Sequence, residues 1–125
     1  MVTSGADFPN RVELSSGHTM TFDAGEGSGG EHRAPTSTEG VSAALAACTA
    51  GTIRIYADRK EWDLAGLEVA VETTYDGPNP VRFDLTVGLP AGLSEDRAER
   101  VMRVAGKCPV HRLLAEATEV TVSRG

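Results

Sequence analysis

The chain has 125 residues, of which 40% are hydrophobic and only 5% aromatic, and its formal net charge is −6. This length fits one domain spanning residues 1–125. The acidic balance excludes the clustered basic surface that binds nucleic acid. The N-terminus lacks the basic start and apolar run of a signal peptide, and no segment approaches the roughly 20 apolar residues of a membrane span. We therefore expect a cytoplasmic protein with no nucleic-acid or membrane partner. Its two cysteines are expected to be reduced, catalytic or metal-binding and not to form a structural disulfide.

Two alternating segments predict a hairpin near the N-terminus. Residues 10–15 and 18–23 alternate apolar and polar side chains, and a Ser-Gly pair separates them. A glycine-rich loop follows, from residue 24 to about residue 35. It contains the Gly-x-Gly-x-x-Gly spacing of dinucleotide-binding loops, but residues 31–35 separate it from the next helix and no βαβ unit follows. We therefore interpret it as a flexible loop.

A long helix is predicted to follow this loop. Residues 36–38 offer N-cap hydroxyls, Glu39 suits the positive end of a helix, and the basic pair at residues 59–60 suits its C-terminus. Between these ends, apolar side chains recur at helical spacing. The members of this predicted stripe are Val41, Ala44, Leu45, Cys48, Thr52, Ile55 and Tyr56.

The second half of the chain predicts another hairpin and three further elements. Alternation over residues 67–75 and 81–87 indicates two strands, joined by a turn at residues 76–80. The order of elements is that of an α+β protein with antiparallel hairpins. The remaining predicted elements are a helix from residues 94–96 to Gly106, a short helix over 108–115 and a closing strand over 119–123.

The two cysteines are the candidate chemical groups. Cys48 lies within the long helix, where it is either a small buried hydrophobe or a thiol that needs a cationic neighbour or hydrogen bond to react. Cys108 precedes Pro109, a residue suited to the first helical position, so Cys108 either merely caps a turn or gains thiolate character from the free N–H groups there. The Cys-x-x-His spacing to His111 resembles half of a metal site, but the other histidines are scattered, so no metal is expected.

Charged residues near the long helix are candidate partners of a thiol. Arg33 stands out among the arginines because it lies in the loop just before the helix, although most arginines are solvated surface groups. Glu39 either complements the helix dipole or acts at a site. It precedes Cys48 by nine residues, which places the two on opposite faces of a straight helix.

Two segments resemble a known family. Residues 38–50, Thr-Glu-Gly-Val-Ser-Ala-Ala-Leu-Ala-Ala-Cys-Thr-Ala, are similar to the central helix of the OsmC/Ohr family. Residues 107–114, Lys-Cys-Pro-Val-His-Arg-Leu-Leu, are similar to its second cysteine motif, in the form typical of the OsmC-like branch. The resemblance covers almost the whole chain. It implies an α+β, OsmC-like fold with antiparallel sheets packed around a long central helix, and an intertwined homodimer with its sites at the interface. Because a core with few aromatic residues buries little apolar surface, a dimer would also stabilise the protein by burying more.

The resemblance also implies a function in the oxidative stress response. It implies a thiol-dependent peroxidase, an oxidoreductase that acts on organic hydroperoxides or hydrogen peroxide without a bound cofactor. Cys48 matches the cysteine that becomes a sulfenic acid, and Cys108 matches the one that resolves it as a redox-active disulfide. An external thiol reductant then restores both thiols. The fold must bring the two Cα atoms within roughly 6 Å for this disulfide.

Peroxidases of this family also carry an arginine in an N-terminal loop and an acid near the helix start. The position of that acid falls on Thr38, with Glu39 next to it, and Arg11 or Arg33 would replace the arginine. We take Glu39 and Arg33 as the remaining catalytic candidates. Two alternatives stay open: a non-catalytic module that binds a small molecule or thiol, or senses redox state, and a protein whose cysteines only pack.

Overall fold

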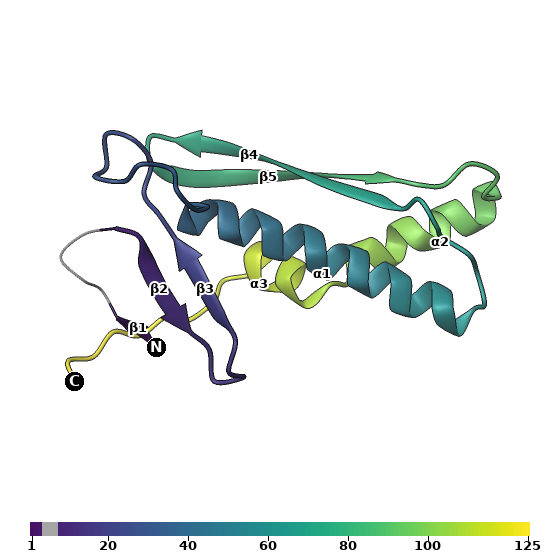
Figure 1. Cartoon of the computed structure of the whole chain (residues 1–125). Coiled ribbons are helices and arrows are strands. Elements are labelled where there is room, and N and C mark those ends of the chain that lie inside the picture. Colours follow the sequence, from purple (N-terminus) through teal and green to yellow (C-terminus); the bar gives the residue numbers. More distant parts are fainter. Residues whose placement is uncertain (4–7) are drawn as a thin grey trace. The chain divides into compact units, whose positions relative to one another are not determined.

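The computed structural model describes residues 1–3 and 8–125, which form two compact units. The first unit spans residues 1–43 and the second residues 44–125, so their boundary falls inside the long helix α1, Ser37–Arg59 (Figure 1). Strands, a long helix, further strands and further helices follow one another along the chain, which confirms the predicted α+β class. That the chain is one domain stays a prediction.

A three-stranded antiparallel sheet lies at the start of the first unit. The predicted hairpin is present, because β2, Asn10–Glu13, pairs with β3, Thr19–Phe22, along its whole length. Gly17 in the connection has a φ of 88°, a left-handed conformation that glycine adopts without strain. Alternation did not predict β1, Val2–Thr3, which has only two residues and pairs with the other edge of β2.

The glycine-rich loop after β3 is organised around one buried carboxylate. The Asp23 side chain accepts hydrogen bonds from the N–H groups of Ala24 at 2.8 Å, Arg33 at 2.9 Å and Glu31 at 3.4 Å. The Arg33 guanidinium lies 3.8 Å from the same carboxylate. Gly30 passes so close to the Ala24 carbonyl oxygen that a Cβ at this position would lie 1.8 Å from it. The last glycine of the Gly-x-Gly-x-x-Gly spacing therefore closes the loop.

Replacing Asp23 with Asn is expected to weaken the first unit at neutral pH and to reduce its sensitivity to acid. The N–H of Arg33 lowers the pKa of Asp23 most; burial opposes this, while the N–H groups of Ala24 and Glu31 and the Arg33 charge lower it further. A carboxyl with a folded-state pKa below its ordinary 3.8 stabilises the fold above that pH, and this contribution is lost as the pH falls through the folded-state value.

Thermal melts of the wild type and the Asp23→Asn variant, from neutral to strongly acidic pH, measure this dependence. The two melting temperatures are expected to converge as the pH falls, because the wild type alone loses the contribution of an ionised Asp23. A difference that stays constant down to the most acidic pH would contradict the role assigned to this carboxylate.

Helix α1 starts with a reciprocal pair of hydrogen bonds. The Glu39 N–H donates to Oγ1 of Thr36 at 3.2 Å, and the Glu39 carboxylate accepts from the Thr36 N–H at 3.0 Å. This arrangement is a capping box, which satisfies two N–H groups that have no partner within the helix. It confirms the predicted N-cap hydroxyl and the first-turn position of Glu39.

The buried face of α1 differs from the predicted stripe. Leu45, Thr49, Ile53 and Ala57 recur at every fourth position and are buried, whereas Ile55 is 56% exposed. An alanine-rich helix has small or apolar side chains on several faces, so its composition does not select one. Packing against neighbouring elements makes that selection.

The second unit contains a long two-stranded antiparallel sheet. Its strands β4, Glu68–Asp76, and β5, Asn79–Gly88, correspond to the second predicted hairpin. The predicted five-residue turn is too long, because pairing continues until only Gly77 and Pro78 remain unpaired. Gly77 has a φ of 59°, which a two-residue connection of this kind requires.

Both predicted helices of the second half are present. Helix α2, Glu95–Ala105, begins after the N-cap Ser94, whose hydroxyl accepts a hydrogen bond from the backbone, and it ends at Gly106. Helix α3, Pro109–Ala115, is short and has Cys108 at its N-cap. The cap residues that the sequence predicted thus begin and end these helices.

The predicted closing strand over residues 119–123 is wrong. The structure has no strand there, and Val120 and Val122 are 81% and 95% exposed. Alternation supplies the two faces of a strand but not the neighbouring strand with which its N–H and C=O groups must pair. Within the described residues this segment has no such neighbour.

The core of the second unit lies where α1, α2 and the β4–β5 sheet meet, and Figure 1 shows the sheet running beside α1. Ile53 and Val101 are fully buried, one on each helix. The half-buried side chains around this core are Trp62, Leu67, Val87, Leu89 and Leu93.

In the described part of the chain, no helix has the length and apolar character needed to cross a membrane.

Candidate active site

The second unit brings the two cysteines together. Cys48 projects from α1, Cys108 precedes α3, and the Cys48 thiol lies within hydrogen-bonding reach of the Cys108 sulfur. Both thiols are free, without a disulfide. The fold therefore places two reduced sulfurs in contact although they are far apart in the sequence.

The two sulfurs differ in their access to solvent. Cys108 is 0% exposed, and its sulfur accepts a hydrogen bond from the His111 N–H at 3.2 Å and another from the Val110 N–H. Cys48 is half-buried. Cys48 is therefore the more exposed of the two residues.

The surroundings of Cys108 favour its thiolate. Burial makes the largest single contribution and raises the pKa of this thiol, but hydrogen bonds together outweigh burial and bring the pKa below its ordinary value of 9.0. In decreasing order, the donors are the Cys48 thiol, the His111 N–H, the Thr49 hydroxyl and the Val110 N–H. Hydrogen bonds to the charged form stabilise that form. This agrees with the second of the two interpretations of the N-cap position, in which the free N–H groups give Cys108 thiolate character.

Thr49 is a member of the site that the sequence argument missed. It is 0% exposed, it follows Cys48 directly, and its hydroxyl is in hydrogen-bond contact with the Cys108 sulfur. A signal for it exists in the sequence, because Thr49 lies between Leu45 and Ile53 at a spacing of four. A polar residue on a buried helix face requires a hydrogen-bond partner.

The other two predicted site residues, Arg33 and Glu39, belong to the first unit. The Arg33 guanidinium donates a hydrogen bond to the carbonyl oxygen of Phe8 at 2.8 Å and lies 3.6 Å from Glu31 and 3.8 Å from Asp23. Glu39 is exposed, and its carboxylate is engaged in the capping box. Both residues thus have structural contacts in their own unit, and their catalytic role stays a prediction.

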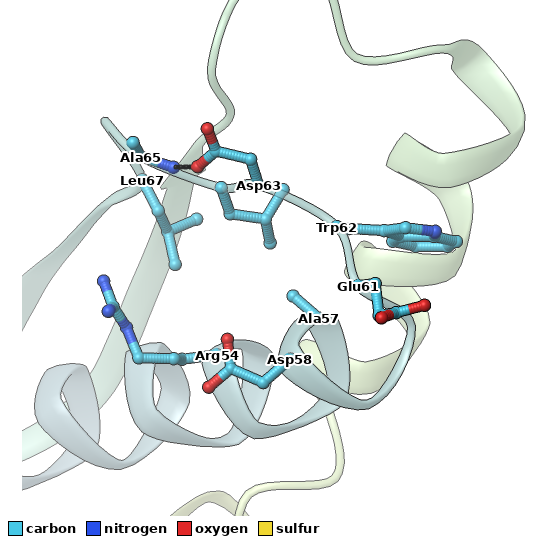
Figure 2. Close-up of a pocket in the computed structure, with 9 residues that line it drawn as sticks. Arg54, Ala57, Asp58, Glu61, Trp62, Asp63, Ala65 and Leu67 are labelled. Carbon is cyan, nitrogen blue, oxygen red and sulfur yellow. Dashed lines mark hydrogen bonds between the residues drawn. The ribbon is translucent and has the colours of Figure 1, made fainter.

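A cavity of about 430 Å³ lies at the C-terminal end of α1. Figure 2 shows Arg54 and Asp58 of α1 facing Asp63 and Leu67 of the following segment, with a dashed line for the hydrogen bond that Asp63 accepts from a backbone N–H. No cysteine lines this cavity. Its nearest residue along α1, Arg54, lies about 9 Å of helix rise beyond Cys48. The cavity is therefore distinct from the cysteine pair.

A second cavity, of about 410 Å³, has a basic lining. Tyr56 of α1 forms one side, and Arg100, Arg103 and Lys107 provide positive charge on the side of α2 and the turn that follows it. Lys107 is also the residue before Cys108.

Among the described residues, no three His, Cys, Asp or Glu side chains lie close enough together to hold a metal ion.

The fold and the cysteine pair define a class of small α+β proteins with a two-thiol site. A family model described as OsmC-like protein matches residues 28–123. This match covers more than half of the chain, so the protein belongs to the OsmC-like family. Both cysteine motifs lie within the matched residues, which confirms the resemblance drawn from them.

Solved structures show the same fold. A putative osmotic stress induced and detoxification response protein from Psychrobacter arcticus is 22% identical, with a TM-score of 0.78 over 90% of this chain and 85% of that one. OsmC of Legionella pneumophila, described as an organic hydroperoxide resistance protein, is 24% identical, with a TM-score of 0.65 over 91% and 85% of the two chains.

A third similar structure contains a ligand. A putative organic hydroperoxide resistance protein of Vibrio cholerae, with captopril bound in one of its active sites, is 21% identical, with a TM-score of 0.62 over 90% of this chain and 81% of that one. A comparison with curated proteins found no match. At these identities the structural likeness shows the fold alone, and it confirms the predicted OsmC-like fold.

Proposed function

We propose that this protein is a thiol-dependent peroxidase that reduces organic hydroperoxides or hydrogen peroxide through Cys48 and Cys108. The observation that carries this proposal is the contact between two free thiols that the fold brings together. Membership of the OsmC-like family supports it, since two similar structures are described as organic hydroperoxide resistance proteins.

The difference in exposure between the two thiols supports a division of their roles. Cys48 is half-buried and open to a peroxide, so we assign it the first attack. Cys108 is fully buried but favours its thiolate, so we assign it the second attack, on a sulfur that is already beside it. Access therefore selects Cys48 as the attacking thiol, although hydrogen bonding favours the thiolate of Cys108.

The proposed cycle has three balanced steps. The Cys48 thiol passes its proton to the neighbouring Cys108 thiolate, and the resulting Cys48 thiolate attacks one peroxide oxygen. The O–O bond breaks, the leaving alkoxide or hydroxide takes that proton from Cys108 to become an alcohol or water, and Cys48 becomes a sulfenic acid. The Cys108 thiolate then attacks the Cys48 sulfur, an S–S bond forms, the S–O bond breaks, and the departing hydroxide takes a proton from solvent to leave as water. An external dithiol is then oxidised as it reduces the disulfide by thiol–disulfide exchange.

The proposal also includes a reductant, a homodimer and a cellular location. The reductant is a small dithiol, and captopril, itself a thiol, in an active site of the Vibrio protein supports a site that accepts such molecules. Ile55 and Leu113 are apolar and more than half exposed in the single chain, which supports a homodimer that buries such residues. A cytoplasmic location, where thiols are kept reduced, suits the chemistry.

We keep Arg33 and Glu39 as the proposed residues that orient the peroxide, with Arg33 acting once released from its acidic neighbours.

Peroxide consumption tests the proposal. Wild type and Cys48→Ser are mixed with cumene hydroperoxide or hydrogen peroxide and an excess of dithiothreitol or dihydrolipoamide, and the peroxide that remains is measured over time. The wild type is expected to turn over repeatedly, and Cys48→Ser to be no faster than the dithiol alone, because serine cannot form a sulfenic acid. Equal rates for the two proteins overturn the peroxidase assignment.

The amount of peroxide consumed separates catalysis from redox sensing. A peroxidase consumes many equivalents per chain when a dithiol is present, whereas a sensor whose disulfide the dithiol does not reach consumes one equivalent and then stays oxidised. Mass spectrometry after one equivalent of peroxide is expected to show a Cys48–Cys108 disulfide. If both cysteines stay reduced, they only pack, and both redox functions are excluded.

A further inference from the structure

Thr49 is a buried hydroxyl in contact with a reacting sulfur. It is 0% exposed, its Oγ1 donates a hydrogen bond to the Leu45 carbonyl oxygen at 2.8 Å, and the same hydroxyl is in hydrogen-bond contact with Cys108. It also follows Cys48 in the sequence, so it contacts one cysteine and adjoins the other. Thr49 therefore contacts the Cys108 sulfur from the same helix that carries Cys48.

The hydroxyl of Thr49 has two partners but only one proton. A threonine hydroxyl donates one hydrogen bond and accepts through two lone pairs. In the structure the proton of Thr49 is donated to the Leu45 carbonyl oxygen, and the lone pairs of the hydroxyl stay available to accept from a neutral thiol. A Cys108 thiolate would offer the same proton a second acceptor, because the hydroxyl is in contact with that sulfur. The hydroxyl can therefore serve Cys108 in either protonation state, as acceptor or as donor.

We propose that Thr49 is a positioning residue that holds the ionised sulfur of Cys108 beside Cys48 for the resolving step. The proposal rests on the proposed peroxidase function for its kinetic consequence. In that step the Cys108 sulfur attacks the sulfenic sulfur of Cys48, an S–S bond forms, the S–O bond breaks, and the departing hydroxide takes a proton to leave as water. As the thiolate is consumed, the proton of Thr49 returns to the Leu45 carbonyl oxygen.

Groups other than Thr49 also contact the Cys108 sulfur and affect its ionisation. From α1, Cys48 and Thr49 face the sulfur, and from α3 the N–H groups of Val110 and His111 do so. The titratable neighbours in sequence are Lys107, which is exposed, and the half-buried His111. None of these groups is altered by a substitution at Thr49, so a change in Cys108 can be assigned to the lost hydroxyl.

Three variants isolate the hydroxyl. Thr49→Val keeps the shape of the side chain and removes the donor, and Thr49→Ser keeps the donor. Thr52→Val is the matched control, because Thr52 makes the same kind of bond one turn on, from its Oγ1 to the Cys48 carbonyl oxygen at 2.8 Å, without a contact to Cys108. Thr49→Ala repeats the test if Thr49→Val does not fold, as judged by circular dichroism.

The first measurement does not require peroxidase activity. In a Cys48→Ser background Cys108 is the only thiol of the chain, so ultraviolet absorbance of the thiolate, followed against pH, reports its ionisation alone. Thr49→Val is expected to move this titration to higher pH, because the thiolate loses a donor. Thr49→Ser and Thr52→Val are expected to titrate like the parent. An unchanged titration in Thr49→Val, or an equal shift in Thr52→Val, overturns the proposal.

The second measurement follows the resolving step. After one equivalent of peroxide, the sulfenic acid on Cys48 is trapped with dimedone at increasing times. Thr49→Val is expected to prolong its lifetime about tenfold, the value of a hydrogen bond to a charged group, while Thr49→Ser and Thr52→Val resemble the wild type. A normal lifetime in Thr49→Val overturns the role in resolution. If no protein forms a sulfenic acid, the peroxidase function fails, and the titration alone decides whether Thr49 holds the Cys108 thiolate.

Discussion

Cys108→Ser is expected to halt the catalytic cycle at the sulfenic acid of Cys48. Cys48 still reacts with a hydroperoxide, but no second sulfur lies beside it to displace the hydroxide. The reducing dithiol must then attack from solution instead of meeting a disulfide. We expect steady-state turnover to fall on the order of 100-fold, since a nucleophile held in place is far more effective than one from solution.

Serine is an informative replacement at this position because it preserves the local structure. Cys108 is the N-cap of α3, and serine is among the preferred N-cap residues. A loss of turnover in Cys108→Ser with unchanged thermal stability therefore reports the missing thiol. The measurements are peroxide consumption with dithiothreitol and dimedone trapping of Cys48. Turnover at the wild-type rate would show that Cys108 does not resolve Cys48.

Ile53→Ala is expected to cause the largest loss of stability, about 2–5 kcal/mol in the free energy of unfolding. Ile53 is 0% exposed, and it packs in the core with Ala57, Val101 and Ala105. Removing three carbon atoms from this position leaves a cavity, because the rigid helices around it cannot close the space. A loss of this size is a large fraction of the roughly 5–15 kcal/mol that stabilises a typical domain.

Ile55→Ala is the matched control for Ile53→Ala, because both isoleucines lie on α1 two positions apart. Ile55 is 56% exposed within one chain, so its truncation is expected to cost less than about 0.5 kcal/mol in a monomer. Urea unfolding of both variants, at two protein concentrations, measures the difference. An equal cost at both positions contradicts the burial pattern of one chain. A cost at Ile55 that grows with protein concentration indicates that a partner chain covers it, as the proposed homodimer requires.

Much of the local structure follows from the sequence because the signals for it are local. Ser94 and Gly106 mark the two ends of α2, and Cys108 is confirmed as the N-cap of α3. Glu39 is confirmed in the first turn of α1. Such caps are recognised from one or two neighbouring residues, since the groups that they satisfy belong to the same turn. The two cysteine motifs likewise identified the family, which the family model confirms.

The failures of prediction concern interactions between distant segments. The strand expected over residues 119–123 is absent, although its alternation is as clear as that of β5. The predicted stripe on α1 included the exposed Ile55 and omitted the buried Ile53. In both cases the residue pattern allows the structure, but a neighbouring element is needed to select it.

By itself, the sequence determined the long helix, the two hairpins and the two later helices, together with the family and the two cysteines that define the candidate site. Only the tertiary structure decided that Cys48 and Cys108 are in contact, that Cys108 is buried and has thiolate character and does not merely cap a turn, and that Thr49 belongs to the site. The physical reason is that burial and hydrogen bonding control the pKa of a thiol, and here they combine groups from α1 and α3. No local pattern in either helix specifies which side chain of the other it will meet.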